Sequence, residues 1–106
     1  MKFEILNGPE DGKIIEIDKE KVTFGRWPDR DIKFLYAKKV TRPHGEIYKK
    51  SNAVFIADIG KEGKGSLHGT IIKRGEEKIK IKGNKAEIKP GDIIIVGKNI
   101  WLRYLG

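Results

Sequence analysis

The chain has 106 residues, the length of a single domain, and it carries a net charge of +8 from 23 Lys and Arg against 15 Asp and Glu. It contains no cysteine, so disulfides, thiolate zinc sites and cysteine nucleophiles are excluded. No stretch approaches the roughly 20 apolar residues of a membrane-spanning helix. The first residues alternate polar and apolar side chains and lack a signal-peptide core. We therefore expect one cytoplasmic domain over residues 1–106, without membrane binding.

The basic composition permits two interpretations. A positive surface attracts anions such as nucleic acid, membrane headgroups or phosphorylated proteins. Abundant Lys, Glu and Ile, with no Gln and a single Met, are equally typical of a thermophilic protein, in which lysine serves stability and solubility. The net charge by itself therefore does not select a partner.

Short apolar or alternating runs, separated by Gly, Pro, Asn and Asp, dominate the chain. In chain order, the predicted strands cover residues 2–6, 13–17, 22–24, 32–35, 45–50, 53–58, 70–73, 78–82, 85–89, 92–96 and 100–105. Residues 78–82 alternate Lys and Ile, which predicts one exposed and one buried face. Residues 93–96 are continuously apolar and β-branched, which predicts a central strand. No segment shows a helical period, so we expect an all-β sandwich.

Several kinds of chemistry are excluded by spacing. His44 and His68 are far apart in the sequence and have no cysteine or organised carboxylates beside them, so we expect no metal site. Ser66 and His44 lack the nucleophile elbow of a hydrolase. The glycine-rich run 60–66 has the wrong spacing for a phosphate-binding P-loop and leads into a strand instead of a helix. We therefore expect a binding protein, not an enzyme, without a cofactor.

The first of three polar clusters follows the strand at 22–24. Gly25 permits a sharp backbone path, and Arg26 has the side chain best suited to hold a phosphate through two parallel hydrogen bonds. An ordinary exposed arginine is the alternative.

The second cluster is residues 40–47. Thr41 offers a hydroxyl group, Arg42 a second cation, and Pro43 stiffens the loop, which lowers the entropy lost on binding. His44 begins a strand, and we expect it to face inward and hold loop backbone.

The third cluster is residues 66–70. Ser66 and His68 carry hydrogen-bonding groups, and Gly69 suits a tight turn. An ordinary hairpin turn is the alternative.

Taken in order, these clusters resemble the forkhead-associated (FHA) domain. The motifs that carry the resemblance are Gly8-Pro9 with Gly12-Lys13, Phe24-Gly25-Arg26, Asp31-Ile32, Val40-Thr41-Arg42 with His44-Gly45-Glu46-Ile47, Asp58 with Gly60, Ser66 with Gly69-Thr70, and Gly91-Asp92 with Ile94 and Gly97. Together they span nearly the whole chain. The resemblance implies an eleven-stranded β-sandwich of two antiparallel sheets that binds phosphothreonine peptides through loops at one end.

The resemblance also implies roles for single residues. Arg26 would be the principal phosphate ligand, Thr41 would replace a serine whose hydroxyl binds phosphate, and Arg42 would reach the same group. Ser66 and His68 would complete the peptide-binding set. The residues expected to support the site structurally are Gly25, His44, Gly69 and Thr70.

Two departures from the family pattern affect the third cluster. His68 stands where the family has an asparagine that holds the peptide backbone, and Leu67 stands where a hydroxyl often contacts phosphate. An insertion at residues 61–65 brings Lys61 and Lys64 near the site in sequence, and we expect them to add auxiliary phosphate contacts.

Two other functions remain open at this point. The departures at Leu67 and His68 are compatible with an FHA domain that binds proteins without phosphate. The net charge, the lysines of 78–82 and the exposed-aromatic candidates Trp27 and Tyr36 are compatible with nucleic-acid binding. Against the latter, the aromatic residues are not interleaved with lysines, and Phe55 and Trp101 are expected in the core. We expect a monomer that binds a phosphothreonine-containing protein.

Overall fold

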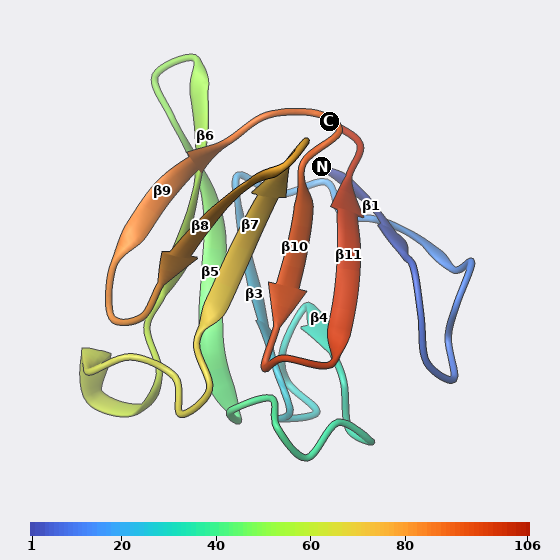
Figure 1. The fold of residues 1–106 in the computed structure, drawn as a ribbon, viewed down its shortest axis with the longest axis vertical. Coiled ribbons are helices and arrows are strands. Elements are labelled where there is room, and N and C mark those ends of the chain that lie inside the picture. Colours follow the sequence, from blue (N-terminus) through green and yellow to red (C-terminus); the bar gives the residue numbers. More distant parts are fainter.

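A computed structural model describes residues 1–106 as two β-sheets packed face to face (Figure 1). The six-stranded sheet has the order β2 (Ile14–Glu16), β1 (Lys2–Ile5), β11 (Ile100–Tyr104), β10 (Ile93–Val96), β7 (Thr70–Arg74) and β8 (Glu77–Ile81). The five-stranded sheet has the order β4 (Ile32–Lys33), β3 (Lys21–Gly25), β5 (Pro43–Lys50), β6 (Ala53–Asp58) and β9 (Lys85–Ile88). A single 3-10 turn, η1, covers Lys61–Gly63. No helix is long and apolar enough to cross a membrane.

All eleven predicted strands are present, and the sandwich is confirmed. One pair differs from the expected antiparallel pattern, because β4 runs parallel to β3. Residues 26–31 lead the chain back so that β4 can run beside β3 in the same direction, and hydrogen bonds of Asp31 hold this segment in place. The amide of Thr23 donates to Oδ2 of Asp31 at 2.9 Å, and the amide of Asp31 donates to Oγ1 of Thr23 at 3.1 Å.

The core is an apolar cluster of 18 residues between the sheets. Strand β10 lies between β11 and β7, and Ile94 and Val96 are fully buried, so the prediction of a central strand is confirmed. In β8, Ile81 is buried and Lys80 is exposed, in agreement with the predicted alternation.

Phe55 and Trp101 are not core residues, and the prediction for both was wrong. Each alternates with a fully buried neighbour, Ile56 and Leu102, and therefore projects from the outer face of its sheet. Phe55 stacks on Tyr48 with ring centroids 5.8 Å apart. A period of two cannot tell which face is inner when both faces carry large apolar residues.

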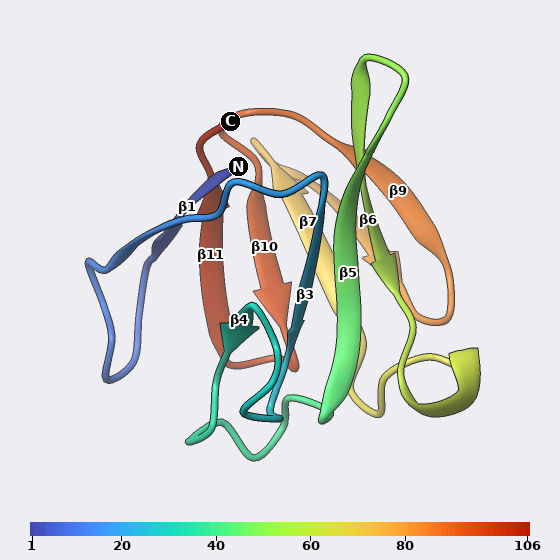
Figure 2. The same ribbon diagram turned by 180° about the vertical axis from the view of Figure 1, so that it is seen from behind.

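The polar clusters lie in loops at one end of the sandwich, at the bottom of Figures 1 and 2. These loops are residues 26–31 between β3 and β4, residues 34–42 between β4 and β5, and residues 59–69 between β6 and β7. The two termini lie together at the opposite end, where the amide of Lys2 donates to the carbonyl of Gly106 at 3.1 Å. The fold thus separates the chain ends from the loops that carry the candidate site.

Candidate functional site

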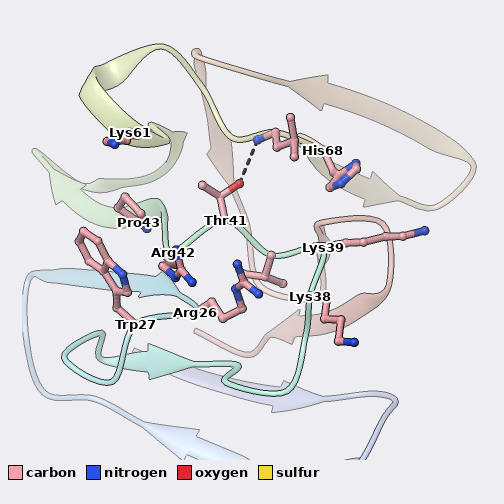
Figure 3. A pocket seen from close by; sticks show the side chains of 11 residues that line it. Arg26, Trp27, Lys38, Lys39, Thr41, Arg42, Pro43, Lys61 and His68 are labelled. Carbon is pink, nitrogen blue, oxygen red and sulfur yellow. Dashed lines mark hydrogen bonds between the residues drawn. The ribbon is translucent and has the colours of Figure 1, made fainter.

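A pocket of about 230 Å³ opens between the three loops (Figure 3). It is lined by Arg26, Trp27, Lys38, Lys39, Val40, Thr41, Arg42, Pro43, Lys61, Leu67 and His68. The structure therefore brings together four of the five residues predicted to bind a ligand, and leaves Ser66 outside the lining.

Arg26 is positioned by its glycine neighbour. A Cβ atom on Gly25 would lie 1.9 Å from the carbonyl oxygen of Arg42, so only glycine allows the two segments to approach this closely. The amide of Arg26 then donates to the carbonyls of Thr41 and Arg42, at 3.2 and 3.0 Å. These contacts hold the start of the Arg26 side chain against the loop that carries Thr41.

The Nε atom of Arg26 is buried and has no hydrogen-bond partner, and it is the one buried side-chain nitrogen or oxygen of the protein in this condition. Leaving a buried donor unpaired costs about 1–3 kcal/mol. Folded proteins pair nearly all such groups with protein, water or an ion, so this exception calls for an explanation. An anion in the pocket would pair with the guanidinium of Arg26 through charge-assisted hydrogen bonds.

Thr41 presents its hydroxyl to the same pocket. Oγ1 accepts a hydrogen bond from the amide of Leu67 at 2.9 Å, drawn as the dashed line in Figure 3. Because the hydroxyl acts as acceptor in that bond, its own proton is free to be donated to a ligand. The same bond ties the loop at 34–42 to the loop at 59–69.

His44 is fully buried and faces inward, as expected. Its Nδ1 accepts the amide proton of Thr41 at 3.0 Å, so the ring is neutral and its proton lies on Nε2. Nε2 donates to the carbonyl of Gly69 at 3.1 Å and lies 3.0 Å from Oγ1 of Thr70. Burial lowers the pKa of His44 below its usual value, although the nearby carboxylate of Asp58 acts in the opposite direction. The ring therefore links the loop at 34–42 to the loop at 59–69.

Asp58 organises the base of the loop at 59–69, a role that sequence reasoning missed. Its carboxylate accepts hydrogen bonds from the amide and hydroxyl of Ser66, both at 2.6 Å, from the hydroxyl of Thr70 at 2.7 Å and from the amide of Gly83 at 3.1 Å. The side chain is fully buried. The sequence shows only that Asp58 ends an apolar strand. Aspartate at that position is common in many kinds of turn, so the pattern does not predict this network.

Ser66 belongs to this buried network, contrary to our expectation that it contacts a ligand. It is fully buried, and its hydroxyl donates to Asp58 and accepts the amide proton of Gly69 at 2.9 Å. Both hydrogen-bonding capacities are used inside the protein, so Ser66 shapes the turn at Gly69 and Thr70. Gly69 has a φ of +81°, which favours glycine.

Leu67 and His68 occupy the rim of the pocket. Leu67 is 71% exposed and supplies no hydroxyl, while its carbonyl accepts a hydrogen bond from Nζ of Lys82 at 3.1 Å. The imidazole of His68 makes no hydrogen bond within the chain and remains available, with its donor and its acceptor, to a ligand.

Of the two lysines in the insertion, only Lys61 lines the pocket. Lys64 is 81% exposed and lies 3.8 Å from a carboxylate oxygen of Glu62. Two lining lysines, Lys38 and Lys39, were missed, because lysine pairs in loops carry no specific signal in a lysine-rich sequence.

The pocket is strongly electropositive. Five of its lining residues are Arg or Lys, and none of the lining residues is acidic. None of these five cations forms a salt bridge, whereas lysines elsewhere do, such as Lys13 with Glu10 at 2.9 Å. Unpaired cations concentrated in a hollow attract an anionic ligand.

A model of the FHA domain family matches residues 22–97, a span that includes all three loops. The chain belongs to the FHA domain family.

Two curated relatives match over most of the chain. The oxoglutarate dehydrogenase inhibitor of Corynebacterium jeikeium is 32% identical over 90% of this chain and 62% of that protein. The protein of the same name from Corynebacterium diphtheriae is 30% identical over 89% of this chain and 57% of that protein. The chain thus spans about 60% of the length of these relatives.

Solved FHA structures share the architecture. The Slr1951 protein from Synechocystis sp. matches with a TM-score of 0.75 and 26% identity, over 98% of this chain and 92% of that one. The FhaA FHA domain, solved in complex with the intracellular domain of Rv3910, matches with a TM-score of 0.71 and 19% identity over 96% of both chains. Mycobacterium tuberculosis EmbR, solved with a low-affinity phosphopeptide, matches with a TM-score of 0.76 and 18% identity over 98% of this chain and 24% of that one. At such low identities, the last two matches support the FHA fold alone.

Proposed function

We propose that this FHA domain binds phosphothreonine-containing segments of partner proteins in the pocket between its loops, without catalysis. The observation that carries the proposal is a pocket lined by five arginines and lysines without salt-bridge partners, Arg26 among them. In this assignment Arg26 is the principal phosphate ligand, and the hydroxyl of Thr41 donates to a second phosphate oxygen.

The charge of the ligand fits this site. A phosphothreonine carries about −1.5 to −2 charges and three acceptor oxygens near neutral pH. Arg26, Arg42 and Thr41 supply donors for these oxygens, and each hydrogen bond to a charged group contributes about 1.5–3 kcal/mol. Lys61 adds charge from the inserted loop. Lys64, which lies outside the lining, contributes at most long-range attraction.

In this proposal, His68 forms hydrogen bonds with the backbone of the bound segment. Its imidazole lines the pocket and offers one donor and one acceptor, though not on a single planar amide as asparagine does. Because Leu67 has no hydroxyl, phosphate binding loses the free energy of about one hydrogen bond, while the contacts of Arg26 and Thr41 remain.

The functional partner is another protein. Both curated relatives are named as inhibitors of oxoglutarate dehydrogenase, so that enzyme is a first candidate for a binding experiment. We further propose that residues 1–106 form one cytoplasmic FHA domain. The continuous 18-residue core, to which strands from β1 to β11 contribute, supports a single folding unit.

Fluorescence anisotropy with threonine peptides, phosphorylated and unphosphorylated, tests the proposal. We expect binding that requires the phosphate and that Arg26→Ala lowers by at least about 100-fold, since two charge-assisted hydrogen bonds are lost. Arg103→Ala removes a cation that pairs with Glu4 outside the pocket, and serves as the charge control. Equal binding of the two peptide forms, or an unchanged affinity in Arg26→Ala, would exclude the proposal.

A second candidate function, phosphate-independent protein binding, is favoured by one observation. The exposed Leu67 places an apolar side chain at the pocket rim where a hydroxyl would serve a phosphate ligand. Pull-down from phosphatase-treated and untreated lysates, with wild type and Leu67→Ser, separates the two functions. Capture that survives phosphatase and is lost in Leu67→Ser supports the second candidate.

A further inference from the structure

Trp27, at the rim of the pocket, has no part in the proposed binding of phosphate. Trp27 follows Arg26 directly, lines the same pocket and is 41% exposed. Figure 3 shows its indole ring on the same side of the pocket as Pro43 and Arg42, opposite His68 and Lys39. Tryptophan is enriched among the residues that dominate binding energy at interfaces, so its exposure next to the phosphate site calls for a function.

The indole ring is held in place before any ligand binds. The guanidinium of Arg30 lies 5.5 Å from the centroid of the Trp27 ring. Asp29 fixes that guanidinium, because Nε and Nη2 of Arg30 donate to its two carboxylate oxygens at 3.1 and 3.2 Å. The amide of Arg30 donates to the carbonyl of Trp27 at 3.2 Å and closes a turn that contains Pro28. These contacts restrain the indole ring, which lowers the entropy lost when a ligand packs on it.

The surroundings of Trp27 select the chemistry of what can pack there. Arg26, Arg42 and Lys61 line the same pocket, and Arg30 lies against the ring. A cationic side chain would be repelled by these groups, although an isolated indole ring attracts cations. An anionic side chain would be drawn to the lysines and arginines and would gain nothing from the ring. The contact that the ring itself can add is with an apolar side chain, and Pro43, on the same side of the pocket, adds apolar surface.

We propose that Trp27 is a specificity-determining residue that packs against an apolar side chain close to the phosphothreonine of the bound segment. This inference rests on the proposed function and narrows it: the partner segment carries an aliphatic, proline or aromatic residue within a few positions of the phosphothreonine. The site then has two separate tasks. Arg26 and Thr41 bind the phosphate, and Trp27 contacts the neighbouring side chain.

A positional scan tests the inference. The probes are phosphothreonine nonapeptides with alanine at all other positions, in which one position, from three before to three after the phosphothreonine, carries Leu, Pro, Phe, Asp or Lys. Each peptide is titrated by fluorescence anisotropy against wild type, Trp27→Ala and Trp27→Phe. Tyr36→Ala is the matched control, since Tyr36 is a similarly exposed aromatic residue that does not line this pocket. Thermal unfolding of each variant verifies the fold.

At one or two positions, wild type is expected to bind Leu, Pro or Phe about 5–10-fold more tightly than the alanine parent peptide. Trp27→Ala should remove this preference, while Trp27→Phe and Tyr36→Ala should largely keep it. An apolar preference that persists in Trp27→Ala, or the absence of any apolar preference in wild type, overturns the inference. If Arg26→Ala abolishes binding in that case, the phosphate-dependent function stands alone. If wild type binds none of the phosphorylated peptides, the proposed function fails and the inference fails with it.

Discussion

The amide of Thr41 donates a hydrogen bond to Nδ1 of His44 at 3.0 Å, and this bond can exist only while the imidazole is neutral. Because Oγ1 of Thr41 also accepts a hydrogen bond from the amide of Leu67, the protonation state of one buried ring is linked to the geometry of two loops at the pocket. The bond therefore connects the stability of the fold with the shape of the pocket.

The first prediction concerns pH. The pKa of His44 is lowered in the folded protein by burial, so below pH 6.5 the unfolded chain takes up a proton that the folded chain does not. Stability is expected to be full above pH 6.5 and to fall below it, by at most about 1.4 kcal/mol per pH unit from this residue. Urea unfolding at pH 7.5, 6.5 and 5.5 measures the slope.

His68 provides the control for this experiment, because it is the only other histidine and lines the pocket at the surface. His68→Gln should keep the pH dependence. His44→Gln should be less stable at every pH and should lose most of the slope between pH 7.5 and 5.5. A slope that disappears with His68 instead would contradict the assignment to His44.

The second prediction separates binding from stability at Arg26. Arg26→Met removes the guanidinium and its unpaired buried Nε while keeping much of the apolar stem. We expect the free energy of unfolding to stay the same or rise by up to about 1 kcal/mol, whereas phosphopeptide binding is lost. Arg26→Lys keeps the charge without the planar fork, and should bind at least about 10-fold more weakly than wild type. A large loss of stability in Arg26→Met would show that Arg26 serves the fold.

The third prediction concerns Gly25. In Gly25→Ala the new methyl group would overlap the carbonyl oxygen of Arg42, so the backbone must move, at a cost of about 1–3 kcal/mol or more. Because Arg26 and Arg42 are carried by the two segments that separate, phosphopeptide affinity should fall as well. Urea unfolding and anisotropy titration measure the two effects. Gly75→Ala, where a methyl group meets open space at a φ of +60°, should lower stability through backbone strain and leave affinity unchanged.

The sequence was sufficient to predict the strands, because alternation and β-branched runs report local burial directly. It also located Arg26, Thr41 and His44 at strand ends. It failed where the outcome depends on contacts between distant segments. The burial of Ser66 is decided by its hydrogen bonds to Asp58 and by the turn that Gly69 closes on its hydroxyl. The outward position of Phe55 is decided by the packing of one whole sheet on the other. The parallel pairing of β4 likewise depends on how residues 26–31 fold back.

The fourth prediction concerns the departure at His68. His68→Asn places at the pocket rim an amide whose donor and acceptor lie on one planar group and can meet a peptide N–H and C=O together. We expect phosphopeptide affinity to rise by about 3–10-fold, the contribution of one further hydrogen bond. His68→Ala should lower affinity by a similar factor, and neither variant should change stability much, because the side chain makes no hydrogen bond within the fold. If His68→Asn and His68→Ala bind equally, the residue does not contact the peptide backbone, and recognition rests on Arg26, Thr41 and the apolar rim at Trp27.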